Sequence, residues 1–250
     1  MSGAPEDLCR VLDFDSEFFG LRIGRMSHDS PGSEEFQSAL SWCRDRGVRC
    51  LYFLCPSMAL ESALAAARAG FELIDLRVTL LAKREEAPRL AAFEAPTRLA
   101  RPEDLLVLRE IAGTQFRETR FWADQRFPRD RAAELYRLWI EKDFLHPEGF
   151  VLVTEASGQI TGFASGMLLG GGRAKLSLIA VRSHARKQGL GRALVGGVMR
   201  RALEMGATSI ETVTQGRRAG AVRLYESQGF RTESIEIWFH RWFSGPHDSV

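Results

Sequence analysis

The chain has little of several features that define common protein classes. Its 250 residues include 34 basic and 32 acidic ones, so the net charge is only +2. Such a balance gives no strong positive field for nucleic acid or a membrane surface. No run approaches the 18 apolar residues of a membrane span, and the opening MSGAPEDLCR lacks the apolar core of a signal peptide. We therefore expect a cytoplasmic globular protein that binds neither nucleic acid nor membrane.

Cysteine is also scarce, and it is confined to one end of the chain. The four cysteines are Cys9, Cys43, Cys50 and Cys55, and none of them forms a C-x-x-C pair. The five histidines are scattered and form no H-x-x-x-H pair. We predict no metal site, and we expect reduced, mostly buried thiols of the kind found in reducing compartments.

Two common phosphate-binding loops are missing as well. No G-x-x-x-x-G-K-[ST] run occurs, and residues 189–194, GLGRAL, lack the last glycine of G-x-G-x-x-G. Present instead are an apolar strand pattern over residues 175–181, the turn RKQGLG, and a helix pattern over residues 190–205. A strand that turns through glycines into a helix presents backbone N–H groups and the positive end of the helix dipole. This pattern predicts a pyrophosphate-binding turn, the alternative being an ordinary strand-to-helix turn.

A second motif follows in TQGRRAGAVRLYESQGF, residues 214–230. The [RQ]-x-x-G-x-[GA] turn, together with Ala221, Tyr225, Gly229 and Phe230 at their spacing here, resembles the two signature segments of the GNAT acetyltransferases. Arg218 stands where that pattern has asparagine. Arginine cannot accept a hydrogen bond, but it can bind a phosphate.

The resemblance extends to a narrower group. The segments LDFDSEFFGLRIGRM, FRETRFWADQRFP and IWFHRW are similar to the dTDP-fucosamine acetyltransferase type, whose members acetylate the amine of a nucleotide-linked amino-deoxysugar. This likeness covers nearly the whole chain. It implies an α/β fold with a mixed sheet and helices on both faces, and acetyl-CoA as the cosubstrate.

The resemblance also implies roles for individual residues. The cofactor-binding residues that it implies are Ile179, Ala180, Val181, Arg186, Lys187, Gln188, Gly189, Leu190, Gly191, Arg192 and Arg218. Backbone N–H groups around residues 179–181 are expected to bind the thioester carbonyl. Tyr225 is the candidate general acid, because a phenol with a pKa of about 10 is protonated at neutral pH and can donate to the CoA sulfur. The alternative for Tyr225 is a packing residue of an amphipathic helix.

The general base and the acceptor site are less defined. Glu155, Glu211 and His240 lie at or near strand ends, and a water relay or an amine deprotonated before binding fits equally well. The long loop over residues 116–128 holds arginines among aromatic residues, a combination suited to phosphates and a sugar or base. We predict that Arg117 and Arg120 bind the substrate, with Arg126 beside them. The alternative is a solvated loop that its aromatic residues anchor.

Two halves are expected, residues 1–90 and 95–245, with a charged, proline-containing linker over residues 83–96. In the first, a strand over residues 49–55 and a helix over residues 58–69 precede a strand over residues 70–81. The segments ARAGFELIDLRVTL and ESQGFRTESIEIWF share a helix, Gly-Phe, strand pattern. We therefore predict a degenerate GNAT-like module in the first half, the alternative being chance similarity.

The second half is expected to be the catalytic GNAT domain, with the order β-α-α-β-β-β-α-β-α-β. Its strands are predicted over residues 97–100, 150–155, 159–169, 175–181, 209–213 and 230–240. Its helices are predicted over residues 103–115, 129–142, 190–205 and 219–228.

We hypothesise that the chain is an N-acetyltransferase. It would move the acetyl group of acetyl-CoA to the amine of a small molecule, such as a nucleotide-linked amino-deoxysugar, by direct attack in a ternary complex. Acetylation of a protein N-terminus or lysine and a non-catalytic acetyl-CoA-binding module are the alternatives. A homodimer is left open.

Overall fold

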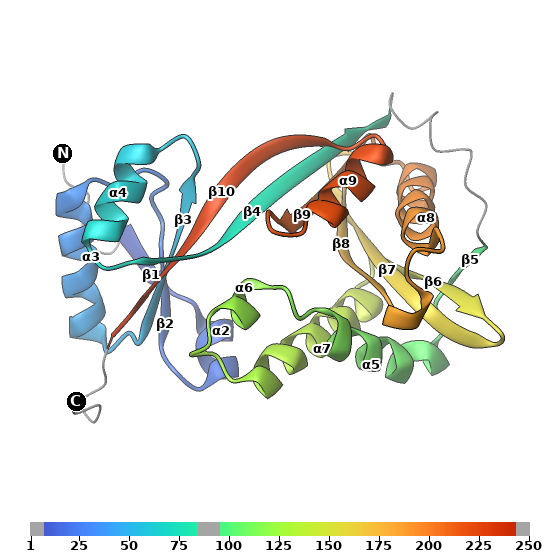
Figure 1. The fold of residues 1–250 in the computed structure, drawn as a ribbon, viewed down its shortest axis with the longest axis horizontal. Helices are drawn as coiled ribbons and strands as arrows, with labels where there is room; N and C mark the ends of the chain where they lie inside the picture. Colours follow the sequence, from blue (N-terminus) through green and yellow to red (C-terminus); the bar gives the residue numbers. More distant parts are fainter. Residues whose placement is uncertain (1–7, 85–95, 244–250) are drawn as a thin grey trace. The chain divides into compact units, whose positions relative to one another are not determined.

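The computed structural model describes residues 8–84 and 96–243, and it divides into two compact units (Figure 1). Unit 1 comprises Met1–Arg77, Ala123–Phe127 and Ile235–Val250, and unit 2 comprises Val78–Trp122 and Pro128–Ser234. Each unit draws on more than one segment of the chain, whereas the predicted halves 1–90 and 95–245 are consecutive. Most of the predicted linker lies outside the described residues.

Unit 1 is a small sheet with helices. Its elements are β1 (Cys9–Val11), α2 (Asp13–Phe19), β2 (Ile23–Met26), α3 (Ser33–Arg46), β3 (Cys50–Pro56), α4 (Leu60–Arg68), the start of β4 (Glu72–Lys83) and the end of β10 (Arg231–Trp242). The strand order is β1-β2-β3-β10. Strands β2 and β3 are parallel and are joined through α3, while the β1–β2 and β3–β10 pairs are antiparallel.

Strand β3 organises the core of unit 1, because successive side chains of a strand point to opposite faces. Leu51 and Phe53 pack in a cluster with Phe36 of α3 and Ala66 of α4. On the other face, the Tyr52 ring stacks on the His240 ring, with their centroids 4.6 Å apart. All four cysteines are buried, as predicted. Burial raises the pKa of the Cys9 thiol to about 12, so this thiol stays protonated at neutral pH.

Unit 2 follows the order predicted for the second half of the chain. Its elements after β4 are β5 (Thr97–Leu99), η2 (Pro102–Asp104), α5 (Leu105–Gln115), α6 (Arg120–Ala123), α7 (Arg129–Leu145), β6 (Gly149–Ala156), β7 (Gln159–Gly170), β8 (Arg173–Val181), η3 (Ser183–Ala185), α8 (Leu190–Glu204), β9 (Ser209–Gln215) and α9 (Ala219–Ser227). The strand order is β4-β9-β8-β7-β6-β5. The short helix α6 lies within the predicted loop 116–128, and the chain enters unit 1 at its end.

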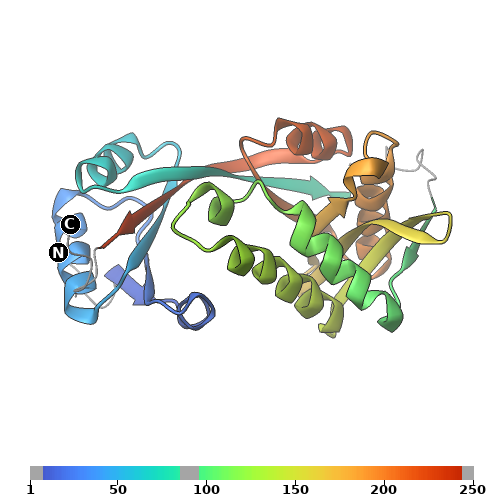
Figure 2. The same ribbon diagram turned by 60° about the horizontal axis from the view of Figure 1, so that its bottom comes forward.

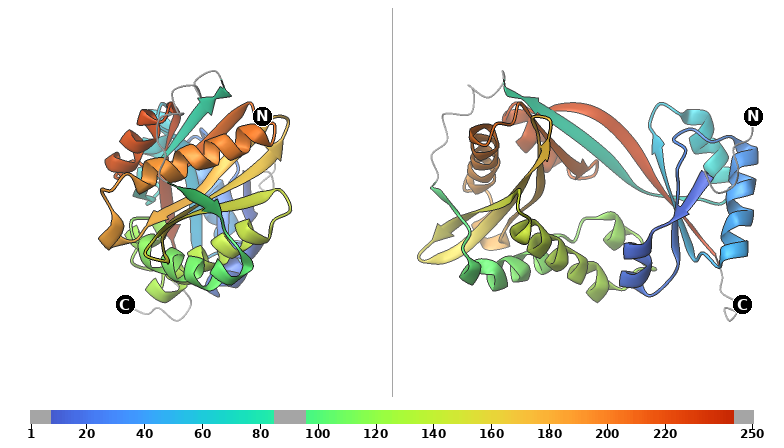
Figure 3. Two further views of the ribbon diagram at one scale, coloured as in Figure 1. Left: turned by 90° about the vertical axis from the view of Figure 1, so that its right-hand side faces the viewer. Right: turned by 180° about the vertical axis from the view of Figure 1, so that it is seen from behind.

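Two layers of apolar side chains cover the sheet of unit 2. Along β6, Phe150 and Leu152 belong to the cluster that contains α8, whereas Val151 and Val153 belong to the cluster that contains α5 and α7. Figure 2 shows α5 and α7 side by side, and Figure 3 shows α8 on the opposite side of β6, β7 and β8. This mixed α/β architecture confirms the predicted fold class. None of the helices among the described residues is long and apolar enough to span a membrane.

Candidate active site

The site of unit 2 begins where two parallel strands separate. Strands β8 and β9 pair from Arg173 opposite Ser209 to Leu176 opposite Thr212, and the Thr212 hydroxyl donates to the Leu176 carbonyl at 3.1 Å. Beyond this point β8 continues to Val181 and β9 to Gln215. The carboxyl ends of the two strands thus leave an interval in the sheet, and residues of both strands line the cavity beside it.

The amide groups of β8 face this interval at alternate residues. The Leu178 N–H donates to the Ser165 hydroxyl of β7 at 3.1 Å, so it points toward β7. Because consecutive N–H groups of a strand point to opposite edges, those of Ile179 and Val181 point toward β9. Both residues line a cavity, and their N–H groups can donate to an oxygen that enters the interval.

The turn after β8 contains two residues in the left-handed region. Gly189 is the N-cap of α8 with φ +80°, and Lys187 has φ +64°, a conformation that non-glycine residues seldom adopt. The first N–H groups of any helix have no acceptor within the helix, and those of α8 are not capped by a side chain either. Together with the helix dipole they form an anion-binding end.

A cavity of about 670 Å³ lies at this turn. Ten of the eleven predicted cofactor-binding residues line it: Ile179, Ala180, Val181, Arg186, Lys187, Gly189, Leu190, Gly191, Arg192 and Arg218. Gln188 is not among the lining residues. The structure thus brings the two sequence motifs, which are separate in the chain, to one cavity.

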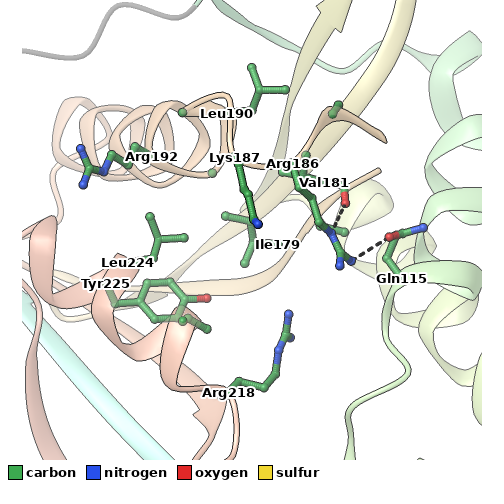
Figure 4. Close-up of a pocket in the computed structure, with 16 residues that line it drawn as sticks. Gln115, Ile179, Val181, Arg186, Lys187, Leu190, Arg192, Arg218, Leu224 and Tyr225 are labelled. Atoms are coloured by element: carbon green, nitrogen blue, oxygen red, sulfur yellow. Dashed lines mark hydrogen bonds between the residues drawn. The ribbon is translucent and has the colours of Figure 1, made fainter. Parts of the chain in front are cut away.

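Arg186 stabilises the turn through hydrogen bonds on both sides. Its guanidinium donates to the Val181 carbonyl at 3.3 Å and to the Gln115 side-chain oxygen at 2.9 Å, as Figure 4 shows. The Ser183 hydroxyl donates to the same Gln115 oxygen at 3.3 Å. Gln115, the last residue of α5, therefore ties the turn to the opposite wall of the cavity, a role that the sequence did not suggest.

Tyr225 lies on the inner face of α9 and lines the same cavity, with only 3% of its surface exposed. Its hydroxyl and the Arg218 guanidinium both point into the cavity in Figure 4. Burial raises the pKa of the Tyr225 phenol, an effect opposed by a hydrogen bond with Thr212 and by the positive charge of Arg218. The phenol is therefore protonated at neutral pH and can act as a proton donor.

Comparison with known proteins identifies this part of the chain. Residues 115–230 match the model of the acetyltransferase (GNAT) family, and this range contains the strand interval, the turn and Tyr225. The chain carries a GNAT acetyltransferase domain. It is thus an acetyl-transferring enzyme, and the thioester that such enzymes use is acetyl-CoA.

Two curated relatives act in sugar chemistry according to their names. The chain is 28% identical over 176 residues to the dTDP-fucosamine acetyltransferase of Escherichia coli O6:H1, covering 69% of this chain and 72% of that protein. It is 24% identical over 141 residues to the spore coat polysaccharide biosynthesis protein SpsD of Bacillus subtilis, covering 56% of this chain and 48% of that protein. This GNAT chain is therefore similar to the dTDP-fucosamine acetyltransferase type.

A solved structure agrees on the fold. The GCN5-related N-acetyltransferase from Sphaerobacter thermophilus superposes with a TM-score of 0.65 at 16% identity, covering 94% of this chain and 76% of that one. At this identity the likeness concerns the fold alone.

A second cavity of about 530 Å³ meets the first one. Both are lined by Ile179, Arg218 and Tyr225. The aromatic side chains of Phe116, Tyr136 and Trp139 also line the second cavity. Phe116 and Tyr136 are stacked, with ring centroids 4.6 Å apart. The second cavity thus offers flat apolar surfaces beside the interval between the strands.

A third, smaller cavity of about 360 Å³ is cationic. Arg117, Arg186 and Arg218 line it, and Glu118 forms an ion pair with Arg218 at 3.2 Å. Arg218 therefore lines all three cavities. The asparagine-to-arginine departure in the motif places a cation where the cavities meet.

The other predicted arginines of the loop 116–128 lie elsewhere. Arg120 lies over the Phe121 ring at 4.1 Å and lines none of the three cavities. Arg126 belongs to unit 1, where it forms ion pairs with Asp124 and Glu72 at 2.8 Å. The loop is thus not one phosphate clamp, and of its arginines Arg117 lines the cationic cavity.

None of the three candidate bases lines the first two cavities. Glu155 pairs with Arg98, His240 is buried in unit 1, and Glu211 stands opposite Lys175 in the paired part of β9. The structure shows another carboxylate instead, that of Asp143 near the end of α7, which lines the second cavity. Its sequence signal is a polar residue at helical spacing from the buried residues Tyr136 and Ile140.

Proposed function

We propose that this enzyme transfers the acetyl group of acetyl-CoA to an amine of a small molecule, most specifically a nucleotide-linked amino-deoxysugar. The reaction is a direct attack in a ternary complex, without an acetylated enzyme. The observation that carries this proposal is the junction of two cavities at Ile179, Arg218 and Tyr225. Two substrates can occupy such cavities together, with their reacting atoms at the junction.

The residues of the first cavity fit acetyl-CoA. The N–H groups at the start of α8 bind the pyrophosphate, and Lys187 and Arg192 add positive charge. When bound, acetyl-CoA supplies a thioester whose carbonyl lies in the interval between β8 and β9. The N–H groups of Ile179 and Val181 then stabilise the charge that develops on the carbonyl oxygen, and such donors contribute about 3–4 kcal/mol each to catalysis. Tyr225 donates its phenolic proton to the departing sulfur.

The acceptor class follows from charge and from the relatives. A nucleotide-linked sugar carries a diphosphate, and arginine side chains bind such groups through paired hydrogen bonds. Arg117 and Arg218 of the cationic cavity suit this role. The curated relatives named for dTDP-fucosamine and for polysaccharide biosynthesis support the same class.

A panel of amines tests the acceptor class. The panel contains free 4-amino-4,6-dideoxygalactose, its 1-phosphate, its dTDP conjugate and a peptide with a free N-terminus. We expect kcat/KM to rise with each added phosphate charge by about 10- to 100-fold, the equivalent of a charge-assisted hydrogen bond of about 1.5–3 kcal/mol. A peptide that is an equal or better substrate would contradict the sugar-nucleotide class and favour protein acetylation.

Variants locate the diphosphate site. Arg117→Ala is expected to lower kcat/KM for the dTDP conjugate by about tenfold or more, and to change it little for the free sugar. Arg120→Ala tests the sequence-based prediction separately, because Arg120 lies over Phe121 and outside the cavities. Arg200→Ala, an exposed change on α8, is the control for charge alone. Equal losses for the free sugar and the conjugate in Arg117→Ala would contradict the assignment.

A further inference from the structure

Asp143 is a carboxylate that the fold holds at the wall of the second cavity. Its Oδ2 accepts a hydrogen bond from the Ser165 hydroxyl at 2.6 Å. The Ser165 oxygen in turn accepts the Leu178 N–H at 3.1 Å, which leaves the single Ser165 hydroxyl proton for Asp143. Three elements of the fold, α7, β7 and β8, therefore fix the direction of this side chain.

Asp143 is partly buried, and none of the basic side chains that the structure describes forms a direct ion pair with it. Burial raises the pKa of Asp143, while hydrogen bonds from Ser165 and Ser177 and the charges of Lys175 and Lys142 act in the opposite direction without cancelling the effect. A carboxylate has about four acceptor positions, of which two serine hydroxyls use two. Asp143 therefore has the capacity for a further donor, and it gains from one that carries positive charge.

Asp143 shares its cavity with the groups that face the thioester position. Ser177, which hydrogen bonds to Asp143, Ile179, whose N–H faces the interval between β8 and β9, and Tyr225 all line the second cavity. An amine nitrogen that Asp143 binds there is therefore in the same cavity as the residues at the junction with the first one.

We propose that the carboxylate of Asp143 binds the acceptor amine in the second cavity and takes up the proton that the amine must lose before it attacks the thioester. This inference rests on the proposed function and names the residue that the sequence left open. The acceptor class is a primary amine on a flat or ring-shaped group, because the stacked rings of Phe116 and Tyr136, with Trp139, line the same cavity.

The proton balance of the step is complete. The acceptor arrives as an ammonium ion and gives one proton to Asp143. The neutral nitrogen attacks the carbonyl carbon, the C–N bond forms, and the C–S bond breaks as Tyr225 protonates the sulfur. The second proton that the nitrogen loses returns to the Tyr225 phenolate through solvent. Asp143 releases its proton to solvent, so the products are the amide, the CoA thiol and one proton.

Asp143→Asn tests the proposal, because asparagine retains an oxygen that can accept the Ser165 hydroxyl but is not basic. With the dTDP conjugate of the panel, we expect kcat/KM to fall by about 100-fold or more, within the range of general-base catalysis. Binding of the conjugate to the CoA-bound enzyme should weaken by about tenfold or more, as calorimetry would show. The affinity for acetyl-CoA should not change.

Two further variants separate a chemical role from a structural one. Asp143→Glu keeps the base and should recover part of the activity. Glu141→Gln removes a carboxylate two residues away on the same helix, one that pairs with Arg109 and lines none of the cavities, and it should retain wild-type activity. The pH profile is a third readout. As pH is lowered, the wild-type kcat/KM should fall when Asp143 becomes protonated, at a pH above the ordinary pKa of an aspartate. Asp143→Asn should lose this decrease at acidic pH.

The titratable and charged groups that share the cavity with Asp143 are Lys142, His146, Lys175, Arg218 and Tyr225. These groups are present in both wild type and Asp143→Asn. A decrease in kcat/KM at acidic pH that is seen in wild type and lost in the variant therefore comes from Asp143. If wild type acetylates the conjugate and Asp143→Asn does so at a similar rate with similar acceptor affinity, the inference is wrong and the proposed function stands. If wild type acetylates no amine of the panel, the proposed function fails and this inference fails with it.

Discussion

Two carboxylates, the buried Asp124 of unit 1 and the partly buried Asp143 of unit 2, have opposite surroundings. Asp124 of unit 1 accepts hydrogen bonds from His240 Nδ1 and Trp242 Nε1, both at 2.7 Å, and from Arg126 Nε at 2.8 Å. Asp143 of unit 2 is held by serine hydroxyls at the wall of a cavity. The first carboxylate is saturated by donors, and the second has acceptor capacity left for a ligand.

The surroundings shift the pKa values of the two carboxylates in opposite directions. Burial alone would raise the pKa of Asp124, but the hydrogen bonds from His240, Arg126 and Trp242 outweigh it and hold the pKa below its ordinary value. At Asp143, burial prevails and the pKa is raised. A carboxylate whose ionised form is stabilised by the fold contributes to stability, whereas one whose ionised form is disfavoured is available for chemistry.

Asp124→Asn is expected to have the largest effect on stability. Donors surround both oxygens of Asp124, so the NH₂ group of asparagine would face donors in either orientation of the amide. A buried polar group left without its partner costs about 1–3 kcal/mol, and more where a charge is involved. Urea unfolding followed by tryptophan fluorescence measures the change, with the exposed substitution Asp130→Asn as control. A loss below about 1 kcal/mol would contradict the structural role of this cluster.

The same cluster should be sensitive to acid. The folded-state pKa of Asp124 is lowered, so its contribution is present above the unfolded-state value of about 3.9 and is lost as pH falls below it. Wild type should therefore lose stability below about pH 4 more steeply than Asp124→Asn. Parallel stability curves for the two proteins below that pH would show that Asp124 does not carry this dependence.

Tyr225→Phe is the next largest change, and it acts on activity in unit 2. It removes one hydroxyl and keeps the ring that packs on Phe230, with centroids 5.6 Å apart. We expect kcat to fall by about 100-fold or more while acetyl-CoA affinity and unfolding free energy are nearly retained. Retained kcat, with the chemical step shown to limit the rate, would remove Tyr225 from the mechanism.

Gly189→Val should have a smaller effect, which is confined to the affinity for acetyl-CoA. A Cβ at Gly189 meets no atom within 4 Å, so the expected cost comes from the backbone, which has φ +80°. A left-handed conformation costs a residue with a Cβ about 1–2 kcal/mol, and more for a β-branched one. Acetyl-CoA binding should weaken by about tenfold or more in calorimetry. Unchanged affinity in a folded variant would show that the shape of this turn is not what binds the pyrophosphate.

The local elements of unit 2 could be predicted from the sequence, because each carries its own periodicity. The helix predicted over residues 190–205 is found at Leu190–Glu204, and the strand predicted over residues 175–181 at Arg173–Val181. In unit 1 the helix Ser33–Arg46 is not among the predicted elements, although Phe36, Ala39, Leu40 and Cys43 are buried at helical spacing. Its many polar residues weaken that periodic signal.

The partners of charged side chains could not be predicted in the same way. Proximity in the sequence groups Arg126 with Arg117 and Arg120, but its partner Glu72 is 54 residues away. The sequence gives no comparable signal for Asp143, because its environment is made by Ser165 and Ser177, which are inconspicuous residues of apolar strands. Sequence periodicity locates the elements, whereas the chemistry of a charged group depends on contacts that only the folded chain makes.

The most direct test compares the two carboxylates in one assay. Acetyl transfer from acetyl-CoA to the dTDP-linked amine is measured for wild type, Asp143→Asn and Asp124→Asn, at a temperature where all three are folded. We expect transfer by wild type, a loss of about 100-fold or more in Asp143→Asn, and nearly full activity in Asp124→Asn. Equal activity of the two variants, or a larger loss in Asp124→Asn while it remains folded, would contradict the catalytic role of Asp143.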